Sequence, residues 1–339
     1  MKTTLEENKL RTIRRGAEPS GALARNAQFP VKIKTILVPL DFSRASMQVV
    51  SYAVSFAKKF GATLHLLYVS PPDEASAIPG AGHLLRECGE AVALAHERLA
   101  GVQQKHARAF WPENCHVRNG HPYREIGALA REIEADLIVL ATRGHTGLKR
   151  VLLGSTAERV VRFAPCPVLV VRERKRKGGV PLGLVTTNRE LAIRKILVPV
   201  DFSECAITGA MYAALLAKTF DAKLQLFHAV RPPVPVVLDR VTANMSGQDK
   251  ISLANAREEM QALTKLDFMR DVRYETEIRT GHAVDEICAA ASRPDVDLLV
   301  TSTHGRTGFN RALLGSVAEQ VVRYAESPVM IVPSRCAIT

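Results

Sequence analysis

The sequence contains the same segment twice, and this internal repeat limits the possible folds more than any other feature. Residues 137–171 align without a gap to residues 298–332, with 20 identities in 35 positions. Leu37–Ser43 returns in the same way as Leu197–Ser203. Chance would give only a few such matches, so the chain is a tandem duplication of one domain.

Short apolar runs alternate with amphipathic segments in each copy, which is typical of strands and helices in turn. The run 137–140 is continuously apolar, as in a strand whose sheet is covered on both faces. We therefore predict two tandem doubly wound five-stranded parallel-sheet (Rossmann-like) α/β domains at residues 33–172 and 194–333. The strands are expected at 35–39, 62–69, 115–118, 136–141, 167–171, 195–199, 223–230, 273–279, 297–302 and 328–332, and the helices of the first copy at 45–60, 84–110, 122–134 and 155–163.

Positive charge is concentrated outside the two domains. The net charge is +12, of which residues 1–34 contribute +5 and residues 172–195 contribute +6. We expect a basic, disordered tail at 1–32, a basic, glycine-containing linker at 173–193 and a short C-terminal tail at 334–339. Because the domains themselves are nearly neutral, a basic groove for nucleic acid is not expected.

Two further classes of protein are disfavoured by the sequence. No apolar run approaches the roughly 20 residues that span a bilayer, and the N-terminal segment lacks the apolar core of a signal peptide. The six cysteines show neither CxxC spacing nor a cluster with histidine, which is typical of reduced thiols. We therefore expect a cytoplasmic protein without membrane contact.

Candidate binding residues follow the first two strands of each copy. In an open parallel sheet, ligands bind beyond the carboxyl ends of the strands, where the strand order reverses. The aspartate that follows the first strand either begins the next helix or contacts a ligand, and the two roles are compatible. The candidates at these strand ends are Pro39, Leu40, Asp41, Val69, Pro199, Val200, Asp201 and Ala229.

The loop after the fourth strand is rich in glycine in both copies and leads to a Gly-Ser pair that opens a helix. Glycine lets backbone N–H groups approach an anion, and the free N–H groups of a helix N-terminus favour negative charge. Arg143 and Arg306 supply positive charge for the same anion. The alternative is an ordinary glycine turn in which Ser155 and Ser316 are N-caps.

Together these motifs resemble the ATP-binding branch of the universal stress protein family. The phosphate loop of that family is written as glycine, two residues, glycine, nine residues, glycine, and then serine or threonine. Ala141 and Ser302 stand where the family has its first glycine, and the first copy has Arg143 before the next glycine where the family usually has histidine. The matching residues are Gly144, Gly154 and Ser155 in the first copy and Gly305, Gly315 and Ser316 in the second.

The resemblance implies a role for each candidate residue. The ends of the first two strands would line the adenine and ribose of ATP or another adenine nucleotide, and the glycine loop would hold its phosphates, commonly with Mg²⁺ or Mn²⁺. The last strands of the two copies would pair, so that one chain forms a pseudo-dimer that then dimerises. The residues implied at the phosphates are Ala141, Arg143, Gly144, Gly154, Ser155, Thr156, Ser302, Gly305, Arg306, Gly315, Ser316 and Val317.

The sequence leaves three hypotheses for the function. The first is an ATP-binding stress-response or signalling protein whose nucleotide state sets its conformation or its protein partners. The second is a slow ATPase or phosphotransfer enzyme that uses the same sites, and the third is an interaction scaffold that has lost nucleotide binding. His121 and His282 each precede an expected helix, where a role in helix entry is the default and acid–base catalysis the alternative.

Overall fold

The computed structural model describes residues 33–70, 82–105, 114–142, 153–172, 174–175, 181–182, 192–232, 245–303 and 315–333. These residues all belong to one compact unit, Lys32–Cys336. The tails expected at 1–32 and 334–339 lie outside the described residues. In the described part, no helix is both long enough and apolar enough to cross a membrane.

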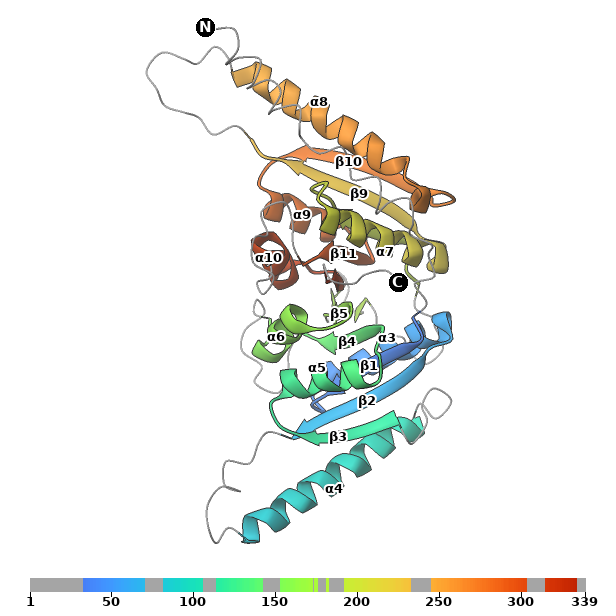
Figure 1. Ribbon diagram of the computed structural model, residues 1–339, viewed down its shortest axis with the longest axis vertical. Coiled ribbons are helices and arrows are strands. Elements are labelled where there is room, and N and C mark those ends of the chain that lie inside the picture. Colours follow the sequence, from blue (N-terminus) through green and yellow to red (C-terminus); the bar gives the residue numbers. More distant parts are fainter. Residues whose placement is uncertain are drawn as a thin grey trace, which may run out of the picture. The chain divides into compact units, whose positions relative to one another are not determined.

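The first repeat is a five-stranded parallel sheet with the strand order β3-β2-β1-β4-β5 (Figure 1). Its strands are β1 (Thr35–Leu40), β2 (Thr63–Ser70), β3 (Cys115–Asn119), β4 (Leu137–Ala141) and β5 (Val168–Val171). The connecting helices are α3 (Arg44–Phe60), α4 (Gly82–Lys105), α5 (Pro122–Glu132) and α6 (Ser155–Phe163). The strand order reverses between β1 and β4, as the predicted doubly wound fold requires.

The second repeat has the same topology, with the strand order β10-β9-β8-β11-β12. Its strands are β8 (Lys195–Pro199), β9 (Lys223–Val230), β10 (Tyr274–Thr280), β11 (Leu298–Ser302) and β12 (Val329–Val332). Its helices are α7 (Glu204–Phe220), α8 (Met245–Thr264), the short 3₁₀ helix η3 (Asp267–Met269), α9 (Ala283–Ala291) and α10 (Ser316–Tyr324). The predicted fold class is therefore confirmed in both halves.

Local sequence explains where the first helix of each repeat begins and ends. The side chain of Ser43 accepts a hydrogen bond from the Ser46 N–H and caps α3, as Ser203 caps α7. Gly61 ends α3 in the left-handed region at φ 65°, where glycine carries no steric penalty. Asp221 takes the same conformation at the end of α7 (φ 53°), which aspartate tolerates better than most residues.

The two sheets join along their last strands. β12 pairs antiparallel with β5, with Met330 opposite Leu169, and this seam merges the halves into one ten-stranded sheet whose outer strands are β3 and β10. All four residues of each seam strand are buried. On one face of the sheet, Phe220 of α7 packs against Phe56 and Phe60 of α3. The internal pairing that the family resemblance implies is present in the chain.

Two short segments within the expected linker pair with each other. Arg174–Lys175 (β6) pairs antiparallel with Pro181–Leu182 (β7), so these residues form a short ladder. The helix expected to continue to residue 110 is described only to Lys105, and residues 106–110 lie outside the described part.

Candidate functional site

A backbone clasp holds the base of the glycine-rich loop at the carboxyl edge of the first sheet. The Thr142 N–H donates to the Val171 carbonyl at 3.3 Å, and the Gly154 N–H donates to the Thr142 carbonyl at 2.8 Å. The first bond ties the loop to the end of β5, and the second closes the loop on itself. The N-terminus of α6 is thereby fixed beside the end of β4.

The second repeat builds the same clasp from different residues. The Thr303 N–H donates to the Val332 carbonyl at 3.1 Å, and the Gly315 N–H donates to the Thr303 carbonyl at 2.7 Å. Thr303 is buried, and so is its neighbour Ser302, which is 9% exposed. Both glycine loops therefore leave and re-enter the fold at one defined point.

Glycine, not serine, occupies the N-cap position of both helices. Gly154 and Gly315 have extended backbone conformations, and neither α6 nor α10 has a side-chain hydrogen bond at its cap. Ser155 and Ser316 are the first helical residues, and both are exposed. The alternative in which these serines are N-caps is therefore wrong. No side chain at the cap position accepts from the first N–H groups of either helix, and the positive end of a helix dipole attracts anions.

The turn after the first strand is strained in both repeats. The Ser43 N–H donates to Asp41 Oδ1 at 3.0 Å, and between these residues Phe42 has a φ of 58°. This left-handed conformation is unfavourable for an aromatic residue and costs about 1–3 kcal/mol, a strain that clusters at functional sites. Asp41 thus supports the capping serine, so it is not itself the N-cap.

The turn of the second repeat adds one more bond. Asp201 Oδ1 accepts from the Ser203 N–H at 3.1 Å and from the Ser203 hydroxyl at 2.6 Å. Phe202 again has a positive φ, 61°. Because the same strain persists in both copies, we regard it as part of the site rather than an accident of one loop.

Aromatic side chains from the second strands flank these turns. The rings of Phe42 and Tyr68 lie 5.0 Å apart, and the Arg98 guanidinium lies 5.5 Å from the Phe42 ring. In the second repeat Phe202 contacts His228 at 4.6 Å. Sequence reasoning missed Tyr68 and His228, although each directly precedes a strand-end residue that it did select.

Hydrogen bonding fixes the tautomer of His228. Its Nδ1 lies 2.7 Å from the Val200 carbonyl oxygen. Since a carbonyl oxygen only accepts, Nδ1 must carry a proton, and the tautomer that fits this contact has its acceptor at Nε2. The first repeat has a phenol at this position, so the two base-side environments differ in hydrogen-bonding character.

The parallel sheet brings most of the predicted residues to one edge. Asp41 lies just past β1 and Ala141 ends β4, and these two strands pair directly. The arrangement repeats with Asp201 and Ser302 at β8 and β11. Thr156 is exposed and Val317 half-buried in the first turns of their helices. Arg143, Gly144, Gly305 and Arg306 lie outside the described residues.

A histidine pair lies outside this edge, between the two outer strands of the first repeat. His65 Nδ1 and His116 Nε2 are 3.0 Å apart, and their ring planes are within 12° of parallel. The ring centroids are 5.3 Å apart, which is the N···N distance plus the distance from each centroid to its own nitrogen. The two nitrogens therefore lie on the line between the rings, and the contact is an in-line N–H···N hydrogen bond. Burial lowers the pKa of both rings, reinforced in His65 by His116.

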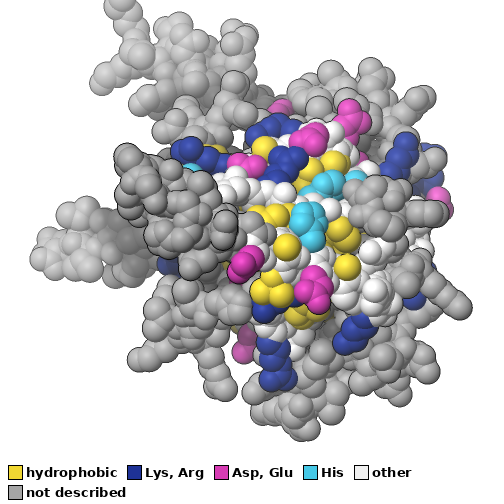
Figure 2. All heavy atoms as spheres, turned by 90° about the horizontal axis from the view of Figure 1, so that it is seen from below, with side chains coloured by type: hydrophobic (Ala, Val, Ile, Leu, Met, Phe, Trp, Pro, Cys, Tyr) yellow, Lys and Arg dark blue, Asp and Glu magenta, His cyan; other side chains and the backbone are white. Residues whose placement is uncertain are grey.

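Figure 2 shows the molecule from below, where histidine side chains lie among hydrophobic and charged ones. The described residues contain no group of three or more histidine, cysteine, aspartate or glutamate side chains able to hold a metal ion. His121 and His282 take the N-cap positions of α5 and α9 without a side-chain cap bond, which matches the default of helix entry.

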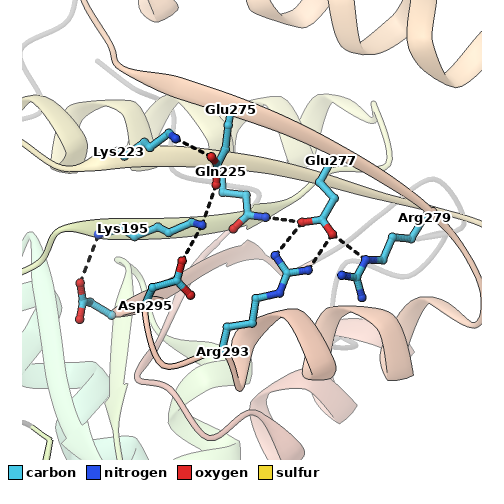
Figure 3. A network of polar contacts seen from close by, with 9 residues as sticks. Lys195, Lys223, Gln225, Glu275, Glu277, Arg279, Arg293 and Asp295 are labelled. Atoms are coloured by element: carbon cyan, nitrogen blue, oxygen red, sulfur yellow. Dashed lines mark hydrogen bonds and ion pairs between the residues drawn. The ribbon is translucent and has the colours of Figure 1, made fainter.

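The second repeat carries an ion network where the first has its histidines (Figure 3). Glu277 receives two hydrogen bonds from Arg293, at 2.6 and 2.8 Å, one from Arg279 at 2.6 Å and a further bond from Gln225. The bonds from Arg293 first, and then those from Arg279, lower the pKa of the Glu277 carboxyl to about 2 against the opposing effect of burial. Lys195 lies nearby and bridges Asp295 and Glu275.

Comparison with known proteins gives the same family for both halves. The universal stress protein family model matches residues 32–172 and 192–333. A universal stress protein of Methanocaldococcus jannaschii is 38% identical over 152 residues, which cover 42% of this chain and 85% of that protein. A universal stress protein of Synechocystis is 24% identical over 317 residues, which cover 88% of this chain and 99% of that protein.

Solved structures agree on the fold across the whole tandem. The crystal structure of a universal stress protein from Archaeoglobus fulgidus is similar with a TM-score of 0.60 at 21% identity, covering 90% of this chain and 98% of that one. One from Pseudomonas aeruginosa gives a TM-score of 0.59 at 20% identity, over 92% and 95% of the two chains. With its duplicated sheet, paired last strands and matched family model, this chain belongs to the universal stress protein family.

Proposed function

We propose that each repeat binds an adenine nucleotide, and that nucleotide occupancy sets the conformation or the partners of a cytoplasmic stress-response protein. One observation carries this proposal. In both repeats a backbone clasp fixes an uncapped helix N-terminus at the carboxyl edge of the sheet, beside the strand pair where the strand order reverses. This is the position at which doubly wound sheets hold phosphorylated ligands.

The residues at this edge divide into a phosphate side and a base side. The N–H groups that begin α6 and α10 suit phosphate oxygens, and the exposed hydroxyls of Ser155 and Ser316 are next to them. The aromatic pair of Phe42 and Tyr68 provides an apolar surface for a base. Asp41 would accept from a ribose hydroxyl while it holds its turn.

A divalent cation fits this site only together with the nucleotide. Mg²⁺ commonly binds through one or two carboxylates plus substrate phosphates, keeping several waters. Asp41 and Asp201 are the carboxylates at the described edge, and each already accepts a hydrogen bond from a serine. The cation would therefore neutralise phosphate charge and add affinity, with the protein supplying at most one ligand in each repeat.

Binding is favoured over hydrolysis by the chemistry of the described edge. Hydrolysis needs a group that positions or deprotonates water. The carboxylates of Asp41 and Asp201 are held by the N–H groups of the capping serines, and His121 and His282 begin helices that follow the outer strands. We therefore place the slow ATPase second.

The direct test is to purify the chain gently, denature it and identify released nucleotide by mass spectrometry, followed by calorimetric titration with ATP and Mg²⁺. We expect two binding equivalents per chain. Gly154→Asp and Gly315→Asp should each remove one, because aspartate is a good N-cap whose carboxylate occupies the free N–H groups and repels phosphate.

The matched control is Gly101→Asp, which adds the same charge to α4 where a new Cβ meets no atom within 4 Å. It should retain both equivalents. Unchanged ATP affinity in the Gly154→Asp/Gly315→Asp double variant would overturn the site. Complete absence of adenine-nucleotide binding by the native chain would favour the scaffold hypothesis, and ADP release over hours would favour the ATPase.

Assembly follows from the same proposal. We expect the chain to associate through a second copy of itself, forming a homodimer of pseudo-dimers. Light scattering with and without ATP tests this, and a single-chain mass under both conditions would refute it.

A further inference from the structure

Arg172 reaches from the first repeat into the second. It directly follows β5, and its Nη2 donates to the carbonyl oxygens of Val322 and Arg323, the latter at 2.6 Å. Both carbonyls belong to the last turn of α10, where helix geometry leaves oxygens without an intrahelical partner. The neighbouring Val321 carbonyl accepts from the Ala325 N–H. The guanidinium of one repeat thus caps the C-terminus of a helix in the other.

The capped helix is the one whose opposite end forms the second phosphate site. α10 has only nine residues and begins with Ser316 beside the Gly315 clasp. A cation at the C-terminus and an anion at the N-terminus both interact favourably with the same helix dipole. The guanidinium also fixes the last turn of α10 and, in so short a helix, the direction of its first N–H groups.

The residue equivalent to Arg172 in the second repeat cannot make the reverse connection. The residue that follows β12, in the position equivalent to Arg172, is Pro333. A proline side chain has no hydrogen-bond donor, so it cannot cap α6 in return. At this position, therefore, the described chain has a cation that acts from the first repeat on the second and a proline in place of its counterpart.

Arg172 is also connected, through the backbone, to the proposed site of the first repeat. The Val171 carbonyl, one residue before Arg172, accepts from the N–H of Thr142 at the base of the first glycine loop. A second contact connects α6 and α10, the helices whose N-termini are the proposed phosphate sites. Glu158 in α6 forms an ion pair at 4.0 Å with Arg323 in the last turn of α10. A shift of Thr142 would act directly on the backbone that carries Arg172.

We propose that Arg172 is a positioning residue for the second nucleotide site and makes that site respond to occupancy of the first. This inference rests on the proposed function, because it assigns a regulatory link between the two proposed sites. The link is asymmetric in structure, since the first site lacks the equivalent cation. The coupling of affinities is reciprocal, as binding thermodynamics requires.

The test measures ATP·Mg²⁺ binding one site at a time. With the first site blocked by Gly154→Asp, Arg172→Met should weaken the second site about fivefold, from the loss of a cation at the helix terminus. With the second site blocked by Gly315→Asp, the same substitution should leave the first site unchanged. Arg172→Lys should restore part of the loss, because it returns the charge without the two-carbonyl geometry.

Coupling is read from chains with both loops intact. Filling the first site should change the affinity of the second, and Arg172→Met should abolish that change. Arg270→Met is the charge-matched control, since Arg270 is exposed and pairs only across one turn with Asp267 in the described contacts. Hydrogen exchange of α10 amides should rise in Arg172→Met and not in the control.

Three outcomes overturn the inference. Equal weakening of both sites would assign Arg172 a purely structural role at the seam. Unchanged affinity of the second site, with binding still present, would show that capping α10 does not matter. Absence of nucleotide binding in the native chain would remove the proposed function itself, and this result is distinct because it precedes any substitution.

Discussion

The two repeats agree at the carboxyl edge of their sheets and differ on the face between their two outer strands. At the edge, the clasp, the strained turn and the helix N-terminus occur twice with nearly equal distances. On the face, His65 and His116 of the first repeat correspond in register to Gln225 and Glu277 of the second. The fold therefore tolerates a complete change of polar chemistry away from the edge and keeps its geometry at the edge.

The charges around these positions changed together with them. In the first repeat Arg118 interacts with Glu125 and Glu132, both on α5. In the second repeat an arginine, Arg293, occupies the position equivalent to Glu132 and binds Glu277. One repeat thus satisfies this partly buried position with a neutral histidine pair, and the other with fixed ion pairs. Both solutions give the facing side chains hydrogen-bond partners, although the buried Gln225 Oε1 of the second repeat has none among the described residues.

Acid should lower the stability of the two repeats in separate pH ranges, because one has a histidine pair where the other has the Glu277 network. The larger loss is expected in the second repeat. The pKa of Glu277 is lowered to about 2, first by the Arg293 bonds. A carboxyl with a depressed folded-state pKa stabilises the fold above its ordinary pKa, and this contribution is lost as pH falls from about 4.5 toward 2. The loss is at most about 3 kcal/mol, reduced by solvent screening.

This loss is measured by urea unfolding at stepped pH, with Glu277→Gln as the variant that lacks the titrating group. Native and variant stabilities should converge as the pH approaches 2. Parallel curves across that range would show that Glu277 does not carry the acid sensitivity.

The next largest difference is expected when one partner of an ion pair is removed from each repeat and the free energy of unfolding is compared. Arg293→Met should lower the free energy of unfolding by about 2 kcal/mol, because it leaves a carboxylate that is 23% exposed without its two-bond partner. The equivalent change in the first repeat, Glu132→Gln, should cost less than about 0.5 kcal/mol, since the Glu132 side chain is 63% exposed. Similar losses in urea denaturation would contradict the comparison.

The N-caps of α3 and α7 test whether the carboxyl edges of the two repeats are equivalent. Ser43→Ala and Ser203→Ala should each destabilise by about 1 kcal/mol, through loss of the N-cap bond. Ser203→Ala should cost slightly more, because the Ser203 hydroxyl donates to the Asp201 carboxylate at 2.6 Å, whereas that of Ser43 donates to the Ser46 hydroxyl at 3.4 Å. Thermal unfolding measures both, and a negligible effect in either repeat would break the claimed equivalence of the two edges.

The smallest expected effect concerns the histidine pair. Because burial lowers the pKa of His65 and His116, the unfolded chain binds more protons, and the pair loses stabilisation as pH falls below the ordinary histidine pKa of about 6.5. The opening free energy of the β2 and β3 amides, obtained from hydrogen exchange after division by the intrinsic exchange rate at each pH, should therefore fall by less than about 1 kcal/mol as the pH drops from about 7 to about 5.

His65→Gln/His116→Gln should remove this pH dependence, and His121→Gln is the control because that ring is exposed at a helix N-cap. A pH dependence that survives the double substitution, or one abolished by the control, would place the sensitivity elsewhere in the chain.

The sequence alone predicts the duplicated α/β fold because repetition and apolar periodicity act locally and occur twice. It also places the aspartate turns at strand ends and the Gly-Ser pairs at the starts of helices. The alternative in which Ser155 and Ser316 are N-caps is wrong, since serine and glycine are both acceptable at a cap and only the backbone conformation distinguishes Ser155 from Gly154. The positive φ of Phe42 could not be predicted, because aromatic residues rarely adopt it.

Contacts between segments far apart in the chain could not be predicted from the sequence either. His65 and His116 are 51 residues apart and meet only through the register of β2 and β3. Arg172 and the end of α10 are separated by 150 residues and meet only because β5 pairs with β12. Nothing in the local pattern of the basic segment distinguishes Arg172 from the arginines that follow it.

The seam between β5 and β12 has a consequence for how such a protein behaves in a cell. Two separate subunits would dissociate once their concentration fell below the dissociation constant, whereas a covalent connection fixes the effective concentration in roughly the millimolar range. The pairing within one chain is thus independent of expression level. Each half always faces the same neighbour, so a feature on one side, such as Arg172, can specialise without a matching change on the other.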